Sequence, residues 1–173
     1  LKEAVMPTTA CATYIQSKGK ILTINVSFFD GCKFKASSND FKGVASYLES
    51  TYKVVRTSLL EIIEDLTSDQ KIARTVKELE IFVPNANIPR NVVLIDTPGF
   101  NPGAVSVDNH YEITKHVVEE IADAALILTP QEQAMSATLL RFLQETLHRC
   151  LHRCYFVITK MDNSDPAHRT DIV

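Results

Sequence analysis

The segment from Asn91 to Phe100 constrains the fold of this chain more than any other segment. It begins with an apolar, mostly β-branched run and continues as Asp96-Thr97-Pro98-Gly99. Such a run predicts a strand that is buried on both faces, which is typical of a parallel sheet. Pro98 ends the strand because proline fixes φ and lacks an N–H group. The sequence therefore predicts a central strand with Asp96 at its carboxyl end, where open α/β sheets bind ligands.

Two further apolar segments, 124–128 and 154–159, predict parallel partners for this strand. The segments that precede them, 108–121 and 136–149, are predicted as helices. The order strand, helix, strand, helix, strand is the βαβ pattern of a parallel sheet. We therefore expect an α/β fold with a mostly parallel central sheet.

The first third of the chain has the pattern of antiparallel strands. Residues 20–29 are predicted as a strand because residues 21–28 have the alternation of a half-buried strand, and Ser17-Lys18-Gly19 predicts the turn before it. Asp30-Gly31 predicts a hairpin turn. We expect this part to extend the parallel sheet as an antiparallel edge. Further elements are expected at 11–16 (strand), at 41–52, 58–66 and 69–75 (helices, the first with N-cap candidates at 37–40) and at 76–83 (strand).

Length and composition exclude several classes of protein. The 173 residues suffice for one domain with a hydrophobic core. The net charge of −3 gives no electrostatic basis for a nucleic-acid partner. No apolar run approaches the roughly 20 residues of a membrane-spanning helix. Four cysteines are too few for a disulfide scaffold in a chain of this length, so a reducing cytoplasm is the expected location.

Polar residues follow two of the predicted parallel strands. Asp96 follows the first, and Thr159-Lys160-Met161-Asp162 ends the last. Because the carboxyl ends of parallel strands share one edge, both groups can address the same ligand. Asp96 occupies the place of the carboxylate that holds Mg²⁺ in phosphate-binding NTPases. The Asp162 carboxylate matches the N1–H and N2–H₂ donors of guanine, and Lys160 can lay its aliphatic stem along the base. The pattern predicts GTP rather than ATP, although each motif alone also fits a plain turn after a buried strand.

On these motifs the chain resembles the dynamin-superfamily GTPases, and most closely their bacterial dynamin-like and mitofusin-like branch. Asp96-Thr97-Pro98-Gly99 resembles the third GTPase motif, and Thr159-Lys160-Met161-Asp162 resembles the fourth. Pro7-Thr8-Thr9-Ala10 is similar to the switch I motif. The long insert between Thr9 and Asp96 also fits, because Ras-like GTPases have a much shorter connection there.

The resemblance implies roles at the phosphate end of the nucleotide. Thr9 would coordinate Mg²⁺ and orient the attacking water, which makes it the expected catalytic residue. Asp96 would hold Mg²⁺ through water. The N–H group of Gly99 would contact the γ-phosphate, and Thr97 and Pro98 complete this nucleotide-binding motif.

The resemblance also implies roles at the base and at a dimer contact. Thr159, Lys160 and Asp162 would bind guanine. Phe100 stands where Ras-like enzymes keep a water-positioning glutamine, so a glutamine-dependent mechanism is not expected. Residues 101–107 are the candidate loop for a homodimer through the GTPase domains, which the family forms across the nucleotide.

The fold implied is a three-layer G domain like that of the P-loop NTPases, with an antiparallel edge extension. Residues 1–173 would form a part of a dynamin-type G domain, truncated at both ends, from switch I to the fourth motif. The phosphate-binding loop is expected about 20 residues before Pro7, and so before Leu1. We therefore expect the parent protein to hydrolyse GTP with Mg²⁺, and this fragment alone to be inactive.

The same resemblance implies GTP and GDP as ligands and a membrane-remodelling role, with the membrane bound through domains that this segment lacks. The full-length protein would be cytoplasmic and peripheral to a membrane. Two alternatives stay open from the sequence. One is a pseudo-GTPase or interaction module that binds no nucleotide. The other is a ribosome-assembly-type G domain, which would not need the long insert before Asp96.

Overall fold

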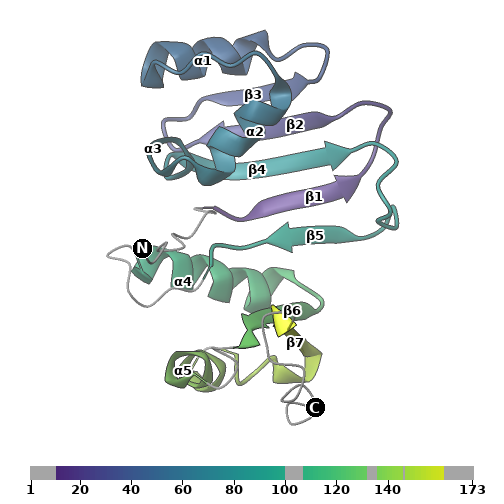
Figure 1. The fold of residues 1–173 in the computed structure, drawn as a ribbon, viewed down its shortest axis with the longest axis vertical. Coiled ribbons are helices and arrows are strands. Elements are labelled where there is room, and N and C mark those ends of the chain that lie inside the picture. The colour runs from purple at the N-terminus through teal and green to yellow at the C-terminus, as the bar shows by residue number, and fades with distance from the viewer. Residues whose placement is uncertain (1–10, 100–106, 132–135, 146, 162–173) are drawn as a thin grey trace. The chain divides into compact units, whose positions relative to one another are not determined.

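The computed structural model describes residues 11–99, 107–131, 136–145 and 147–161 (Figure 1). The chain divides into two compact units, residues 1–114 and residues 115–173. Helix α4 (Val107–His116) includes the boundary between them. An α/β fold is confirmed, because both units contain strands and helices.

The first unit is built on a five-stranded sheet with the strand order β3-β2-β4-β1-β5. The β1–β4 pairing is parallel, and the β1–β5, β2–β3 and β2–β4 pairings are antiparallel. The sheet is therefore mixed rather than mostly parallel. Its strands are β1 (Thr13–Ser17), β2 (Thr23–Phe28), β3 (Lys33–Ser37), β4 (Val76–Val83) and β5 (Val93–Asp96).

The hairpin predicted at Asp30-Gly31 is confirmed by the antiparallel pairing of β2 with β3. Gly31 has a φ of 92°, which a residue without a Cβ adopts at no steric cost. The Asp30 carboxylate accepts bonds from the Cys32 N–H group at 2.8 Å and from the Tyr47 hydroxyl at 2.7 Å. These two donors, the Cys32 N–H first, lower the pKa of Asp30. They fix the tip of the hairpin against the first helix.

Three helices cover one face of this sheet: α1 (Lys42–Tyr52), α2 (Leu59–Ser68) and α3 (Gln70–Ala73) (Figure 1). The core lies between them and the sheet. Burial of these apolar side chains is the main stabilising term of the unit. The most deeply buried members are Ile24, Val44, Leu48, Ile62, Leu66, Ile72 and Leu79.

The strand that the sequence places at the centre of a parallel sheet lies instead at the end of the mixed sheet. β5 pairs with β1 in antiparallel register, and no described strand pairs with its other edge. Val93 and Leu94 are 44% and 47% exposed, so burial on both faces is not observed. An apolar run indicates a tendency toward burial, but it does not encode which strand lies beside it. The central, parallel position predicted for this strand is therefore not confirmed among the described strands.

The two strands joined by the predicted turn Ser17-Lys18-Gly19 do not pair with each other. β4 lies between β1 and β2, and it pairs with both. Alternate residues of β4, among them Leu79 and Ile81, are buried in the same core as Ile24 and Val26 of β2. This long-range packing decides the strand order, whereas Ser17-Lys18-Gly19 only allows the chain to reverse.

The second unit contains the short parallel sheet β6 (Ala125–Pro130) and β7 (Cys154–Thr159), with helix α5 (Ala137–Glu145) between them in sequence. The parallel pairing of these two strands is confirmed. The predicted helix 108–121 changes at residue 117 into a π-helical turn, Val117–Ile121. The predicted helix 136–149 ends earlier, and a short 3-10 turn, Leu151–Arg153, precedes β7.

The Arg153 side chain binds the end of the π-helical turn. Its guanidinium donates to the carbonyls of Ala122 at 2.6 Å, Val118 at 3.0 Å and Glu119 at 2.9 Å. Helix ends leave such carbonyls without partners inside the helix, and a cation there is also favoured by the helix dipole. Arg153 therefore ties the segment before β6 to the segment before β7.

Within the described ranges, no helix has both the length and the apolar character that crossing a bilayer requires.

The N-terminus of α2 allows a test of the fold. Ser58 accepts a bond from the Glu61 N–H group at 3.3 Å, and Glu61 accepts one from the Ser58 N–H group at 3.3 Å. This reciprocal capping box satisfies two donors that the helix leaves open. We expect Ser58→Ala to lower the free energy of unfolding by about 1 kcal/mol in urea titrations. Ser50→Ala, inside α1, is the matched control and should change it by less than about 0.5 kcal/mol. Equal effects of the two substitutions would contradict the capping role.

Candidate functional site

The carboxyl end of β5 lies beside the beginning of β1. In the antiparallel register of the two strands, Asp96 is opposite Thr13. The chain that leads into β1 therefore arrives next to the Asp96 carboxylate, which is exposed. Thr9, the predicted switch I residue, lies outside the described residues, four positions before Thr13.

Cys11 marks how closely this leading segment approaches Asp96. The Cys11 side chain is 3% exposed. Burial, and to a lesser extent the negative charge of Asp96, raises the pKa of the Cys11 thiol to about 11. The electrostatic influence of Asp96 on Cys11 requires that the two side chains lie near each other. No pattern in the sequence indicates that Cys11 lies near Asp96.

The turn after Asp96 is held by helix α4. Pro98 is buried, and its carbonyl accepts a bond from the Thr114 hydroxyl at 3.3 Å. Thr97 is half-buried and Gly99 is exposed. Gly99 thus lies on the surface, where its N–H group is predicted to contact a phosphate. The contribution of Thr114 was not predicted, because nothing in the spacing of residues 98 and 114 indicates the contact.

The end of β7 carries the second predicted motif. Thr159 is half-buried, and Lys160, directly after the strand, is exposed with a φ of 58°. Positive φ is uncommon for residues other than glycine. Lys53 has it as the left-handed cap of α1, and Asn85 is of a type that tolerates it. Lys160 has neither explanation, and such backbone conformations are concentrated at functional sites.

The predicted site is thus divided between the two units. Asp96, Thr97, Pro98 and Gly99 belong to the first unit, and Thr159 and Lys160 belong to the second. Asp162, the predicted guanine ligand, lies outside the described residues, as do Phe100 and residues 101–106. The convergence of the two motifs on one nucleotide stays a prediction.

Metal-binding potential at this place rests on Asp96. A carboxylate oxygen is a ligand type that Mg²⁺ prefers, and Asp96 is exposed at a strand end opposite Thr13. In the part of the chain that the structure describes, there is no cluster of three or more His, Cys, Asp or Glu side chains that could enclose a metal ion. The residues present fit a magnesium ion that is shared with a nucleotide, as in NTPases, better than a dedicated protein cage.

Comparison with known families gives the class of protein to which this chain belongs. The family model for the dynamin family matches residues 1–161. The chain therefore belongs to the dynamin family, and it is a GTPase domain of the kind that binds GTP and GDP. A search of curated protein sequences gives no match.

The proximity of Cys11 to Asp96 can be tested in solution. Asp96→Asn removes a negative charge that disfavours the Cys11 thiolate, so we expect the pKa of Cys11 to fall below about 11. The measurement is the pH dependence of Cys11 alkylation, resolved by mass spectrometry. The alkylation rate should follow the thiolate, and the profile should move to lower pH in the variant. Asp40→Asn, an exposed aspartate outside the site, is the control and should leave the profile in place. An unchanged profile for Asp96→Asn would contradict the proximity.

Proposed function

We propose that this chain forms the part of a Mg²⁺-dependent GTPase domain that runs from switch I to the fourth GTPase motif. The reaction is hydrolysis of the β–γ phosphoanhydride bond of GTP, in which the protein acts by positioning groups and by stabilising charge. The parent protein is proposed to be a dynamin-like membrane-remodelling protein of the bacterial dynamin-like and mitofusin-like branch.

The observation that carries this proposal is the antiparallel pairing of β1 with β5. The register brings Thr13, four residues after Thr9 in the sequence, opposite Asp96 at the carboxyl end of β5. A GTPase needs switch I and the third motif together, because both reach the γ-phosphate and the metal ion.

The phosphate end would work through three groups. The Thr9 hydroxyl and the Asp96 carboxylate would hold Mg²⁺, Asp96 through water, and Thr9 would also orient the attacking water. The Gly99 N–H group would donate to the γ-phosphate from the turn that Thr114 anchors. Mg²⁺, when bound, would supply positive charge that offsets the negative charge developing on the phosphate.

The base end would work through Thr159, Lys160 and Asp162. The Asp162 carboxylate would accept from N1–H and N2–H₂ of guanine, and the Lys160 stem would lie along the ring. The left-handed backbone of Lys160 supports this proposal. It is a conformation that a lysine at a plain strand end would not need to adopt.

We further propose that sequence upstream of Leu1 supplies the phosphate-binding loop and the strand before it. Two features support this. The outer edge of β5 is unpaired among the described strands, and two of its apolar side chains are exposed. In the second unit, Leu126 and Leu128 of β6 are 66% and 64% exposed, and a two-stranded sheet alone is only marginally stable. Native proteins protect open, apolar strands of this kind, so additional chain is expected to cover them.

The location and partners proposed follow from the family. The parent protein would be cytoplasmic and peripheral to a membrane, which it would bind through domains outside this chain. Its GTPase domains would form homodimers across the nucleotide. A pseudo-GTPase is the alternative to the proposed enzyme, and nucleotide titration separates the two.

The first prediction concerns nucleotide affinity. Without the phosphate-binding loop, most hydrogen bonds to the β- and γ-phosphates are missing. We expect calorimetric titration with GTP and Mg²⁺ to give a Kd of about 1 mM or weaker for the 173-residue chain, against about 1 µM for a chain extended upstream through the loop. Micromolar binding by the 173-residue chain would contradict the proposed origin of the loop. An extended chain that contains the loop and binds no GTP would favour the pseudo-GTPase.

In the extended chain, Asp96→Asn should lower the rate of GTP hydrolysis by about 100-fold, because the variant loses a metal-holding negative charge. Asp40→Asn carries the same chemical change on the surface, away from the site, and should leave the rate unchanged. The measurement is phosphate release under saturating GTP. Equal rates for the wild-type chain and Asp96→Asn would disprove the role of Asp96.

A further prediction concerns recognition of the guanine base. Asp162→Asn replaces an oxygen acceptor of guanine N2–H₂ or N1–H by an amide donor. We expect the extended chain to lose about 100-fold in GTP affinity and to gain affinity for xanthosine triphosphate, which has a carbonyl acceptor in place of the amino group. Asp165→Asn, three residues further on, is the matched control and should not change the preference. If the variant still prefers GTP, guanine is not bound by Asp162.

A further inference from the structure

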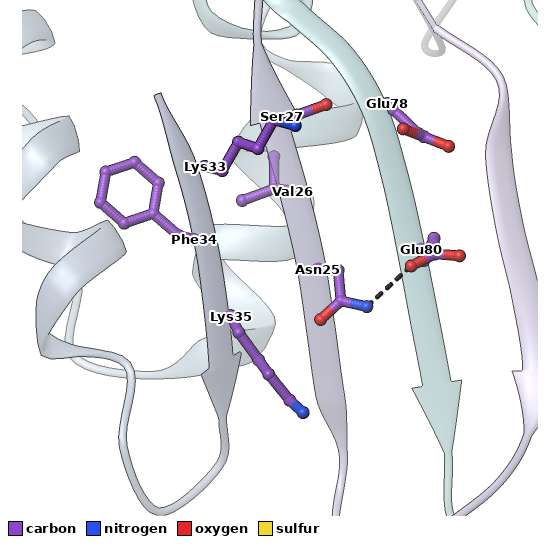
Figure 2. Close-up of a pocket in the computed structure, with 8 residues that line it drawn as sticks. All are labelled: Asn25, Val26, Ser27, Lys33, Phe34, Lys35, Glu78 and Glu80. Carbon is purple, nitrogen blue, oxygen red and sulfur yellow. Dashed lines mark hydrogen bonds between the residues drawn. The ribbon is translucent and has the colours of Figure 1, made fainter. Parts of the chain in front are cut away.

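The sheet of the first unit has a polar face that its helices leave open, here called the outer face. It is formed by paired positions on three neighbouring strands, and Figure 2 shows these side chains. The lysines extend from β3, the glutamates from β4, and the small polar residues lie between them on β2. The members are Asn25, Ser27, Lys33, Lys35, Glu78 and Glu80.

The period of the strands explains why the outer face is open. Successive side chains of a strand point to opposite faces. Ile24 and Val26 are buried under the helices, as are Leu79 and Ile81 of β4. The intervening residues therefore point away from the helices, and within the first unit none of the described helices lies over them (Figure 1). They line a groove of about 390 Å³.

The outer face has its charges in a fixed order. Ser27 is paired with Lys33 on one side and with Glu78 on the other. Each row across the strands therefore reads positive, neutral, negative. The second row repeats the order with Lys35, Asn25 and Glu80, in which the Asn25 amide donates to Glu80 at 2.7 Å.

The lysines and the glutamates of one chain lie on strands that are not neighbours in the sheet. β3 and β4 are separated by β2, which places their backbones about 10 Å apart. Among the residues that the structure describes, neither Lys33 nor Lys35 forms an ion pair. The charges of both rows are thus left for a partner outside the unit.

The arrangement is complementary to itself. A two-fold axis parallel to β2 turns the outer face of a second copy toward the first and exchanges the sides of β3 and β4. Lys33 then faces Glu78 of the second copy, and Lys35 faces Glu80, while the β2 residues lie on the axis. Lysine and glutamate side chains together span the roughly 10 Å between packed sheets. Residue i meets residue j and residue j meets residue i, which is the rule for a two-fold interface.

We propose that two copies of this chain associate face to face through the outer face, independently of nucleotide. A uniformly acidic partner would be repelled by β4, and a uniformly basic one by β3. The matching partner must present both charges in reverse order, and a second copy does so. The proposal does not depend on the GTPase activity, because none of these residues belongs to the nucleotide motifs.

The lysines have a simpler possible role, because β3 is the outermost strand of the sheet. Lysines on an edge strand discourage the addition of further strands. If this is their only role, the chain remains monomeric whether residues 78 and 80 of β4 are acidic or basic. The two explanations can therefore be separated by exchanging charges between the strands.

The test is sedimentation equilibrium of the 173-residue chain without nucleotide, at protein concentrations up to about 1 mM, since interfaces of this kind are weak. We expect a monomer–dimer equilibrium whose Kd rises at least about tenfold between low salt and about 0.5 M NaCl, because salt screens exposed ion pairs. Lys33→Glu/Lys35→Glu should be monomeric, and so should Glu78→Lys/Glu80→Lys. An equal mixture of these two variants, and a variant that carries both pairs of substitutions, should both dimerise again.

Lys42→Glu/Lys71→Glu is the matched control. It makes the same change in net charge on exposed helix residues, and it should leave the dimer intact. Circular dichroism identifies any variant that fails to fold, and Lys33→Gln/Lys35→Gln then replaces the charge reversal, with an expected rise of about tenfold in Kd. A chain that is monomeric throughout, or a dimer that neither reversal weakens, would overturn the proposal. A dimer that forms only when nucleotide is present would also overturn the proposal, because the proposed contact does not depend on nucleotide.

Discussion

The antiparallel pairing of β1 with β5 is the constraint on which the candidate site depends. It brings the start of one strand and the end of another to the same place, so the charge of Asp96 contributes to the raised pKa of Cys11. The hydrophobic core stabilises this arrangement. The apolar residues of β4 pack with those of β2, and β4 pairs with β2 along one edge and with β1 along the other. The position of the Asp96 carboxylate is therefore set by strand register, and the turn that follows it is held by the bond from Thr114 to Pro98.

The sequence predicted local features well and long-range order poorly. The hairpin at Asp30-Gly31 and the parallel pair at the end of the chain were confirmed, because turn residues and apolar runs act over short distances. The place of β5 and the insertion of β4 between β1 and β2 could not be predicted, since several strand orders bury the same apolar residues. For the site, the Asp96 motif could be located from its residues alone. The left-handed backbone of Lys160 could not, because it depends on surroundings that no local pattern encodes.

The same strands serve two purposes on their two faces. Alternate residues of β2 and β4 build the core, and the residues between them carry the ordered charges of the outer face. A shift of one residue in register would bury the charged residues and expose the apolar ones. The hydrophobic core therefore also fixes the charge pattern that a partner would meet, and substitutions in the core are expected to disturb both.

Arg153 has a consequence for how the second unit folds. Its guanidinium joins residues that are 31 to 35 positions apart, immediately before the first paired residues of β6 and β7. Closing a loop of that length lowers the conformational entropy of the chain. Without another contact, two parallel strands must lose this entropy before their first ladder hydrogen bond forms. The hydrogen bonds from the Arg153 side chain to three carbonyls hold the two ends of this loop together, and they can form and break reversibly. Once it is closed, the two strands begin side by side in the correct register, and each further rung of the ladder forms as a local step.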